Sequence, residues 1–159
     1  MLRWSIDDAR RRGSGHICRM PHSSPALAEG SRDPLRRMRV YRLAEELRPV
    51  AWEDAKKLAA EPLTQEIGRQ LYAAVSSIAA NIGEGYSRSS GRDRARIFEY
   101  ALGSVRESMS WYHASEPVLG GALTAARLEP LEEMRRMLLA IIPRERGRVM
   151  KKYAGQTPA

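Results

Sequence analysis

The sequence predicts an all-α protein, an antiparallel up-down-up-down four-helix bundle with a disordered N-terminal arm. Apolar residues recur at helical spacing in four runs, and the alternating pattern typical of strands is missing. The runs are rich in Ala, Leu, Arg and Glu, and only 6% of the residues are aromatic. Short connections containing Gly, Ser or Pro separate the runs, which favours antiparallel neighbours. The 159 residues, 43% of them hydrophobic, suit one domain with an apolar core.

Residues 1–37 are predicted to form a disordered basic extension. They combine arginines with several Gly and Pro residues and show no sustained helical period, so little apolar surface is available to offset chain ordering. His16, Cys18 and His22 have a metal-like spacing in this arm but lack a fourth ligand, and we predict no zinc site there. Met38 follows the arm directly and is a candidate translation start.

The first two helices are predicted over residues 39–60 and 63–86. Pro49 removes one backbone donor from the first helix and is expected to kink it or divide it in two. The Glu-Pro pair at 61–62 then ends this helix, because the residue before a proline avoids the helical region.

The third helix is predicted over residues 91–119 and the fourth from about Pro130. Ser90 and Asp93 fit a capping pattern for the start of the third helix. Thr124 is expected to cap a short turn that leads to Pro130, since proline is well tolerated in a first helical turn. The apolar stripe of the fourth helix is Leu131, Met134, Leu138, Ile141 and Ile142.

The end of the fourth helix carries two interruptions, Pro143 and Gly147. The basic residues 144–152 are therefore predicted to form either a kinked extension or a loose tail. We assign the bundle to residues 38–152 and a frayed tail to residues 153–159.

The charge pattern adds a functional expectation. The net charge of +8 and the pI of about 10.1 favour an anionic partner. The topology brings the start of the first helix, the turn between the second and third, and the end of the fourth to one end of the bundle. Two interpretations of this basic end stay open: a surface that contacts nucleic-acid phosphates without reading bases, or a solvated end whose arginines offset helix dipoles. Its candidate nucleic-acid-binding residues, which adjoin Arg36 and Arg37, are Arg39, Arg42, Arg88, Arg92, Arg94, Arg96, Arg144, Arg146, Arg148, Lys151 and Lys152.

Two motifs carry a family resemblance. Residues 81–85 read Asn-Ile-Gly-Glu-Gly, and residues 101–107 read Ala-Leu-Gly-Ser-Val-Arg-Glu. With Gln70-Leu71 and Ser77-Ile78, they resemble the paired signatures of the 23S rRNA intervening sequence proteins, over about residues 40–142. The chain departs from that pattern in Gly83, where Ala is usual, in Pro49, and in its long N-terminal extension. The resemblance implies a four-helix bundle, ring-shaped pentamers, and kinship with accessory proteins of diversity-generating retroelements, which bind nucleic acid and a reverse transcriptase.

The signature residues are expected to be structural. Glu84 and Glu107 have an alternative interpretation as acid/base groups or metal ligands, but neither has the His three residues later that di-metal bundles use. We expect them to make hydrogen bonds between helices or subunits, for example with Arg69 or Arg106. The structural set is Gln70, Ser77, Asn81, Glu84, Gly85, Gly103, Ser104 and Glu107.

Aromatic residues predict self-association. Phe98 and Tyr100 cannot both face the core that Ile97 and Ala101 face, because nearby helical positions diverge. Some rings should therefore lie on a second apolar face, buried against another subunit. The aromatic residues in excess of one core stripe are Trp52, Tyr72, Phe98, Tyr100 and Trp111.

The combined expectation is a non-catalytic homo-oligomer, a pentamer by resemblance, that binds structured RNA or other nucleic acid through the basic end. The alternative is a protein–protein scaffold or adaptor with no nucleic-acid role. No nucleophile with a nearby base is visible, and we predict no enzyme activity, no cofactor and no metal. No run approaches the roughly 18 apolar residues of a membrane span, and the single Cys18 fits a cytoplasmic protein without disulfides.

Overall fold

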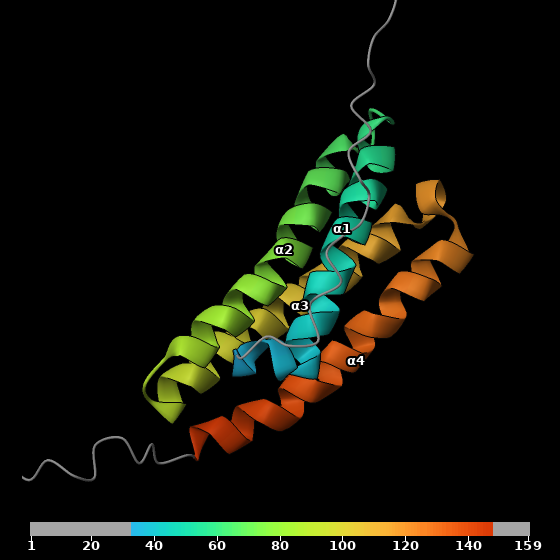
Figure 1. Ribbon diagram of the computed structural model, residues 1–159. Helices are drawn as coiled ribbons and strands as arrows, with labels where there is room; N and C mark the ends of the chain where they lie inside the picture. The colour runs from blue at the N-terminus through green and yellow to red at the C-terminus, as the bar shows by residue number, and fades with distance from the viewer. Residues whose placement is uncertain (1–32, 148–159) are drawn as a thin grey trace, which may run out of the picture. The chain divides into compact units, whose positions relative to one another are not determined.

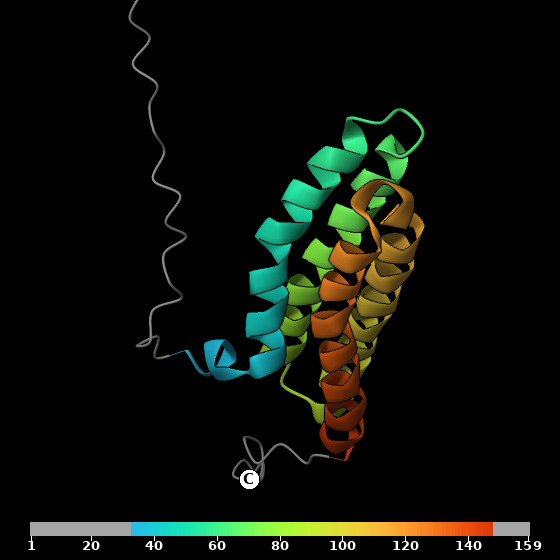
Figure 2. The ribbon, with the colours of Figure 1, turned by 90° about the vertical axis from the view of Figure 1, so that its right-hand side faces the viewer.

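The computed structural model describes residues 33–147, which form four α-helices and one short 3-10 helix. The elements are η2 (Pro34–Arg37), α1 (Arg39–Ala59), α2 (Gln65–Ser87), α3 (Gly91–Leu119) and α4 (Gly121–Arg146). Each α-helix packs against the next, and α1 also meets α3 and α4, so the helices run up and down around one core (Figure 1; Figure 2). The described residues contain no strand, and the all-α four-helix prediction is confirmed.

Several predictions fall outside the described residues. They concern the arm up to residue 32 with its His and Cys residues, the frayed tail, and Arg148, Lys151 and Lys152. Pro34–Arg37, which the sequence assigns to the arm, instead forms η2. The Asp33 carboxylate accepts the Leu35 N–H at 2.9 Å, and the Leu35 side chain packs against the core.

Helix α1 is one continuous helix. Pro49 lies within it at an exposed position, so of the two expected effects of Pro49, a kink or a division, the division into two helices is wrong. Residues three or four positions apart along α1 bury their side chains on one side of the helix. The buried apolar residues of α1 are Val40, Ala44, Leu47, Ala51 and Leu58.

The hairpin of α2 and α3 has the predicted cap and a close helix contact. The Ser90 hydroxyl oxygen accepts the Asp93 N–H at 3.0 Å and donates to the Asp93 carboxylate at 2.8 Å, and α3 begins at the next residue. A Cβ atom on Gly85 would lie 2.7 Å from two ring atoms of Phe98. Gly85 therefore permits the close approach of α2 to α3.

Helix α4 begins nine residues earlier than predicted. Gly120 adopts a φ of 82°, which reverses the chain directly after α3, and α4 starts at Gly121. Thr124 is therefore not a cap: it lies inside α4, buried. Pro130 also lies inside α4 instead of at its start, at a cost of roughly 3 kcal/mol. Burial of the neighbouring Leu131 and Met134 offsets that cost, at about 1.5–3 kcal/mol each.

The core holds some of the predicted aromatic residues and leaves others outside. Phe98 is buried with Ile97 and Ala101, whereas Tyr100 is 55% exposed, so the two rings do face opposite ways. Trp52 is 51% exposed and contacts the Tyr72 ring edge-on, with ring centroids 5.1 Å apart. Among the described residues, no helix is both long and apolar enough to cross a membrane.

Candidate nucleic-acid interface

The predicted convergence of basic segments at one end of the bundle is observed. The start of α1, the turn between α2 and α3, and the end of α4 lie at the same end (Figure 1). Arg94 near the start of α3 approaches Glu145 of α4 at 3.5 Å, which ties the turn to the end of α4. Arg39 at the start of α1 pairs with Glu133 of α4 at 2.5 Å. Because Glu133 lies about 20 Å of helix before Arg146, the basic end is stepped and not flat.

Four of the candidate arginines form ion pairs with glutamates. Arg39 and Glu133 stabilise each other's charge, which raises the pKa of Arg39 and lowers the pKa of Glu133. These pairs, apart from that of Arg94, are solvent-exposed, and exposed pairs contribute little to stability. The pairs are Arg39–Glu133, Arg88–Glu84, Arg94–Glu145 and Arg146–Glu99.

Arg94 is tied to protein groups on every side. Its guanidinium donates to the Tyr86 carbonyl at 2.6 Å and to the Arg88 carbonyl at 3.3 Å, and it lies 5.0 Å from the centroid of the Tyr86 ring. With Glu145 also in contact, its side chain is only 12% exposed. Arg94 therefore caps the carbonyls at the end of α2, and its phosphate contact stays a prediction that this geometry does not favour.

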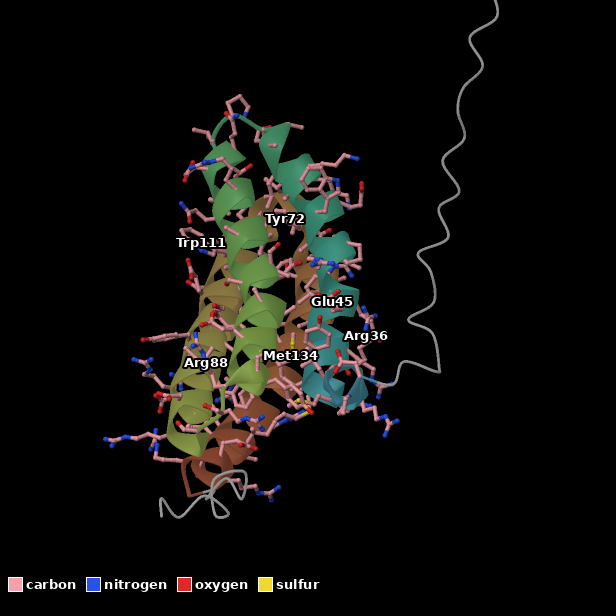
Figure 3. The ribbon with its side chains drawn as sticks, turned by 60° about the vertical axis from the view of Figure 1, so that its left-hand side comes forward. Arg36, Glu45, Tyr72, Arg88, Trp111 and Met134 are labelled. Carbon is pink, nitrogen blue, oxygen red and sulfur yellow. The ribbon has the colours of Figure 1, made fainter. Side chains whose placement is uncertain are left out.

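Other arginines at the basic end have no carboxylate partner within the described residues. They are exposed and form no ion pair within residues 33–147. One group lies in η2 and the first turn of α1, and the other lies at the start of α3 and the end of α4 (Figure 3 labels Arg36 of the first group). The unpaired arginines are Arg36, Arg37, Arg42, Arg92, Arg96 and Arg144.

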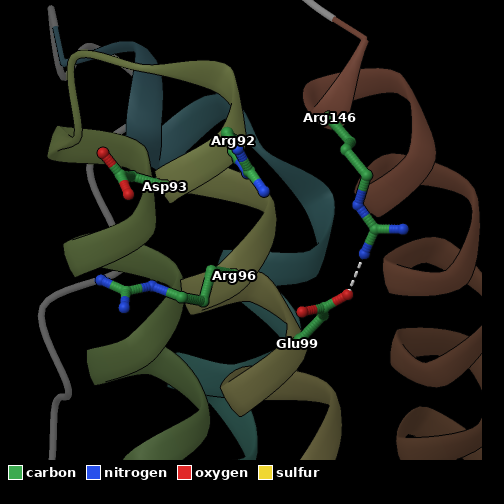
Figure 4. Close-up of a pocket in the computed structure, with 5 residues that line it drawn as sticks. All are labelled: Arg92, Asp93, Arg96, Glu99 and Arg146. Atoms are coloured by element: carbon green, nitrogen blue, oxygen red, sulfur yellow. Dashed lines mark hydrogen bonds and ion pairs between the residues drawn. The ribbon is translucent and has the colours of Figure 1, made fainter.

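A hollow of about 460 Å³ lies between the start of α3 and the end of α4. Its lining residues are Arg92, Asp93, Arg96, Glu99 and Arg146 (Figure 4). Arg92 and Arg146 point toward the space between the two helices, whereas Arg96 points away from Arg146. The Arg146 guanidinium donates to the Glu99 carboxylate across this space. The arrangement offers cationic groups from two helices to one anion.

Three of the signature residues join α2 to α3 through hydrogen bonds. The Ser77 hydroxyl donates to the Ser104 hydroxyl oxygen at 2.8 Å, and the Asn81 amide donates to the same oxygen at 3.3 Å. Ser104 in turn donates to the Tyr100 carbonyl at 3.1 Å. The structural role expected for Ser77, Asn81 and Ser104 is thus what the geometry shows.

The two signature glutamates have local partners within this chain. Glu84 pairs with Arg88, which directly follows α2, and Glu107 accepts the Trp111 indole N–H at 3.3 Å. The suggested partner Arg69 instead pairs with Glu66 of its own helix at 2.9 Å. Neither glutamate bonds to another helix of the described chain, and because both carboxylates are exposed, hydrogen bonds between subunits stay a prediction.

The remaining polar and glycine positions of the signatures make few contacts with other helices. Gln70 donates to Glu66 at 2.8 Å along α2. A Cβ atom on Gly103 would meet nothing within 4 Å, so none of the helices described here packs against this position. At Gly83, an added Cβ atom would make ordinary contacts with Leu35 and Tyr41, so packing does not require this departure from the family pattern.

Sequence reasoning missed a buried polar cluster at Asp54. This residue of α1 is 1% exposed, and its carboxylate accepts from Arg127 of α4 at 2.8 Å and from the Tyr112 hydroxyl of α3 at 3.3 Å. Burial and the Asp54 charge raise the pKa of Tyr112. One signal was available, since Asp54 occupies a core register position between Ala51 and Leu58. Within the described chain no group of three or more His, Cys, Asp or Glu residues is placed to hold a metal.

Comparisons with known proteins agree with this fold. A family model described as 23S rRNA-intervening sequence protein matches residues 36–140. The crystal structure of a protein of unknown function from the S23 ribosomal protein family of Bacteroides thetaiotaomicron matches with a TM-score of 0.61 and 21% identity. The match covers 65% of this chain and 97% of that chain, and at this identity it shows the fold alone. No curated protein matches the sequence.

Proposed function

The chain belongs to the 23S rRNA-intervening sequence protein family, and from that premise we propose that it is a non-catalytic, oligomeric module that binds structured RNA or other nucleic acid through its basic end. The observation that carries this proposal is the set of exposed arginines at that end without ion-pair partners within residues 33–147. Several carboxylates elsewhere in the bundle, among them Glu53, Glu66 and Glu132, pair with nearby arginines and lysines. An anionic polymer is a partner that offers these free guanidinium groups successive negative charges.

Contact with phosphates suits this surface better than reading of bases. Arg94 lies over one face of the Tyr86 ring, the aromatic group next to the α2–α3 turn, which limits stacking of this ring on a base. The guanidinium groups lie on two separate levels of the basic end. This spacing suits contacts with successive phosphates of a nucleic-acid backbone better than contacts with the edges of a single base pair. If most of the unpaired arginines contact a phosphate, log K for a duplex should fall with log salt at a slope of about −5.

Self-association is part of the proposal. Tyr100 and Gly103 lie on the outer side of α3, where Tyr100 is exposed and the space around Gly103 is open within this chain. This face suits burial against a second copy, because a glycine and a large ring let a neighbouring helix approach and gain apolar contact. A ring would repeat the basic end along one rim, and linked weak phosphate contacts would add to avidity.

A mobility-shift titration of the full chain tests the proposal. A labelled RNA hairpin and a DNA duplex are titrated at about 50 and 200 mM salt, where the expected slope gives roughly a thousandfold difference in affinity. The test variant changes Arg92, Arg96 and Arg144 together to Ala. The matched control changes Lys56, Arg69 and Arg106 to Ala; it removes the same charge outside the basic end.

The expected result is salt-sensitive binding that the test variant loses and the control variant keeps. Light scattering on the same samples gives the number of subunits, and circular dichroism checks that both variants fold. Equal losses in the two variants would mean that net charge alone attracts the nucleic acid. Absence of binding by the wild-type oligomer at low salt would overturn the proposal.

The second candidate function is a protein scaffold. The observation that favours it is the exposure of Trp52 and Tyr100, large rings on different helices that are available to a protein partner. Docking through these rings would change little with salt, unlike phosphate binding. Salt dependence of partner binding therefore separates the two functions.

A further inference from the structure

We propose that Glu99 is a built-in competitor of the bound nucleic acid: it holds Arg146 in the free protein, and a phosphodiester group displaces it and is clamped by Arg92 and Arg146. This inference rests on the proposed function and concerns how the hollow between α3 and α4 regulates it. In this proposal Arg146 exchanges the Glu99 carboxylate for a phosphodiester group, and an anion binds in the hollow only if it displaces Glu99.

The Glu99–Arg146 pair is exposed enough to exchange. The two side chains are 44% and 58% exposed, and they come from different helices. Solvent and salt screen such a pair, so its contribution to stability is small. A phosphate oxygen offers the same guanidinium group an equivalent charge-assisted, bidentate partner. Arg92, which makes no ion pair of its own in the described chain, points to the same space and supplies a second cation (Figure 4).

A second contact holds the end of α4 when Glu99 is displaced. The Arg94–Glu145 pair is largely buried, with side chains 12% and 15% exposed, and it links α3 to the same turn of α4. Ile97 of α3 and Ile142 of α4, each three residues from a member of this pair, are also buried. Exchange at Glu99 therefore leaves the bundle intact, which is the condition for a regulating residue as opposed to a structural one.

The other carboxylate in the hollow has a different task. Asp93 accepts the Ser90 hydroxyl, while the Asp93 N–H donates to Ser90, so its carboxylate belongs to the cap of α3. Among the residues that line the hollow, Glu99 is thus the carboxylate whose removal frees an arginine. Its substitution should strengthen binding, the reverse of what substitution of a phosphate-binding residue does.

The test compares Glu99→Gln with Glu129→Gln in the full chain. Both changes remove one negative charge, but Glu129 lies on an exposed position of α4 that does not line the hollow. Affinity for a fluorescent RNA hairpin is measured by anisotropy at several salt concentrations. We expect Glu99→Gln to bind about two- to fivefold more tightly than Glu129→Gln, the range of an exposed ion pair.

A double-variant cycle identifies the route of the effect. Arg146→Ala alone should weaken binding, and the gain from Glu99→Gln should vanish in the Arg146→Ala background because Glu99 acts through Arg146. In a separate arm, inorganic phosphate is added at an ionic strength matched by chloride. Competition no stronger than that of chloride assigns the hollow to the polymer, and stronger competition assigns it to free phosphate and overturns the inference.

The outcomes distinguish this inference from the proposed function. Equal affinities of Glu99→Gln and Glu129→Gln, with salt-sensitive binding by the wild type, would overturn the inference and leave the proposed function standing. A gain that persists without Arg146 would also overturn it. If the wild-type chain shows no salt-sensitive binding, the proposed function fails, and the inference fails with it.

Discussion

Replacing Arg127 by Met should destabilise the bundle more than any exposed arginine substitution. The change removes the guanidinium group 2.8 Å from Asp54 but keeps an apolar stem of similar length. Asp54 is then left buried with the Tyr112 hydroxyl at 3.3 Å and the Lys57 ammonium at 3.9 Å. Breaking a buried pair by removing one partner typically costs about 3–5 kcal/mol.

The structure favours the lower part of this range. Arg127 is partly exposed, so water already screens some of its charge, and Lys57 and Tyr112 remain as weaker partners. We expect a loss of about 3 kcal/mol in the free energy of unfolding, which for a domain of this size lowers Tm by roughly 12 °C. Urea unfolding followed by circular dichroism measures the loss, with Tm as a second readout.

Two further variants make the result decisive. Arg135→Met breaks the exposed Arg135–Glu132 pair on the same helix and should cost no more than about 0.5 kcal/mol. The double variant Asp54→Leu with Arg127→Met removes both charges and should recover most of the stability, because a buried pair often gains little over apolar packing. A cost below about 1 kcal/mol for Arg127→Met, or no recovery in the double variant, would refute the reasoning.

Two more predictions follow from the same core. Gly85→Ala should lower the free energy of unfolding by about 1–2 kcal/mol, because crowding of the buried Phe98 ring outweighs the better helix propensity of Ala. Gly83→Ala on the same helix should instead stabilise, because its Cβ atom would make only ordinary contacts. Urea unfolding of both variants checks this, and equal effects would contradict it. The raised pKa of Tyr112 stabilises the folded state fully below the unfolded value of about 10, and this contribution is lost as pH rises from there toward the folded pKa. Between pH 9 and 11 the wild type should therefore lose stability more steeply than Tyr112→Phe, and parallel curves would count against a buried neutral phenol.

Helix existence and type followed from the sequence, but the start of α4 did not. Ser90 and Asp93 carry local capping chemistry, and α3 begins where they predict. Pro130 carries an equally local signal, yet α4 runs through it because the residues on both sides pack against α3. Local preference of about 3 kcal/mol is overridden when several buried side chains favour the continuous helix.

The basic residues of the candidate site could be identified from the sequence, but not which of them are free. Arg39 and Arg146 look like Arg42 and Arg92 in sequence. Their partners lie far along the chain, so the pairing depends on helix register, which periodicity does not determine. The same limit hid the Asp54 cluster, because its partners come from two other helices.

The two kinds of arginine–carboxylate pair in this bundle divide the tasks of folding and binding. The Asp54–Arg127 pair is buried where α1, α3 and α4 meet, and any other register would leave a charge without a partner in the core. It therefore specifies the arrangement of helices and cannot exchange with solutes. The Arg146–Glu99 pair is exposed, contributes little to stability, and can exchange. If exposure is what decides this division, raising the salt concentration should weaken nucleic-acid binding strongly while the cost of Arg127→Met stays nearly constant. Ions reach both charges of the exposed pair, whereas Asp54 of the other pair is only 1% exposed. Unfolding of wild type and Arg127→Met at 50 and 500 mM salt measures this, and a cost that falls in step with nucleic-acid affinity would show that the two pairs differ only in degree.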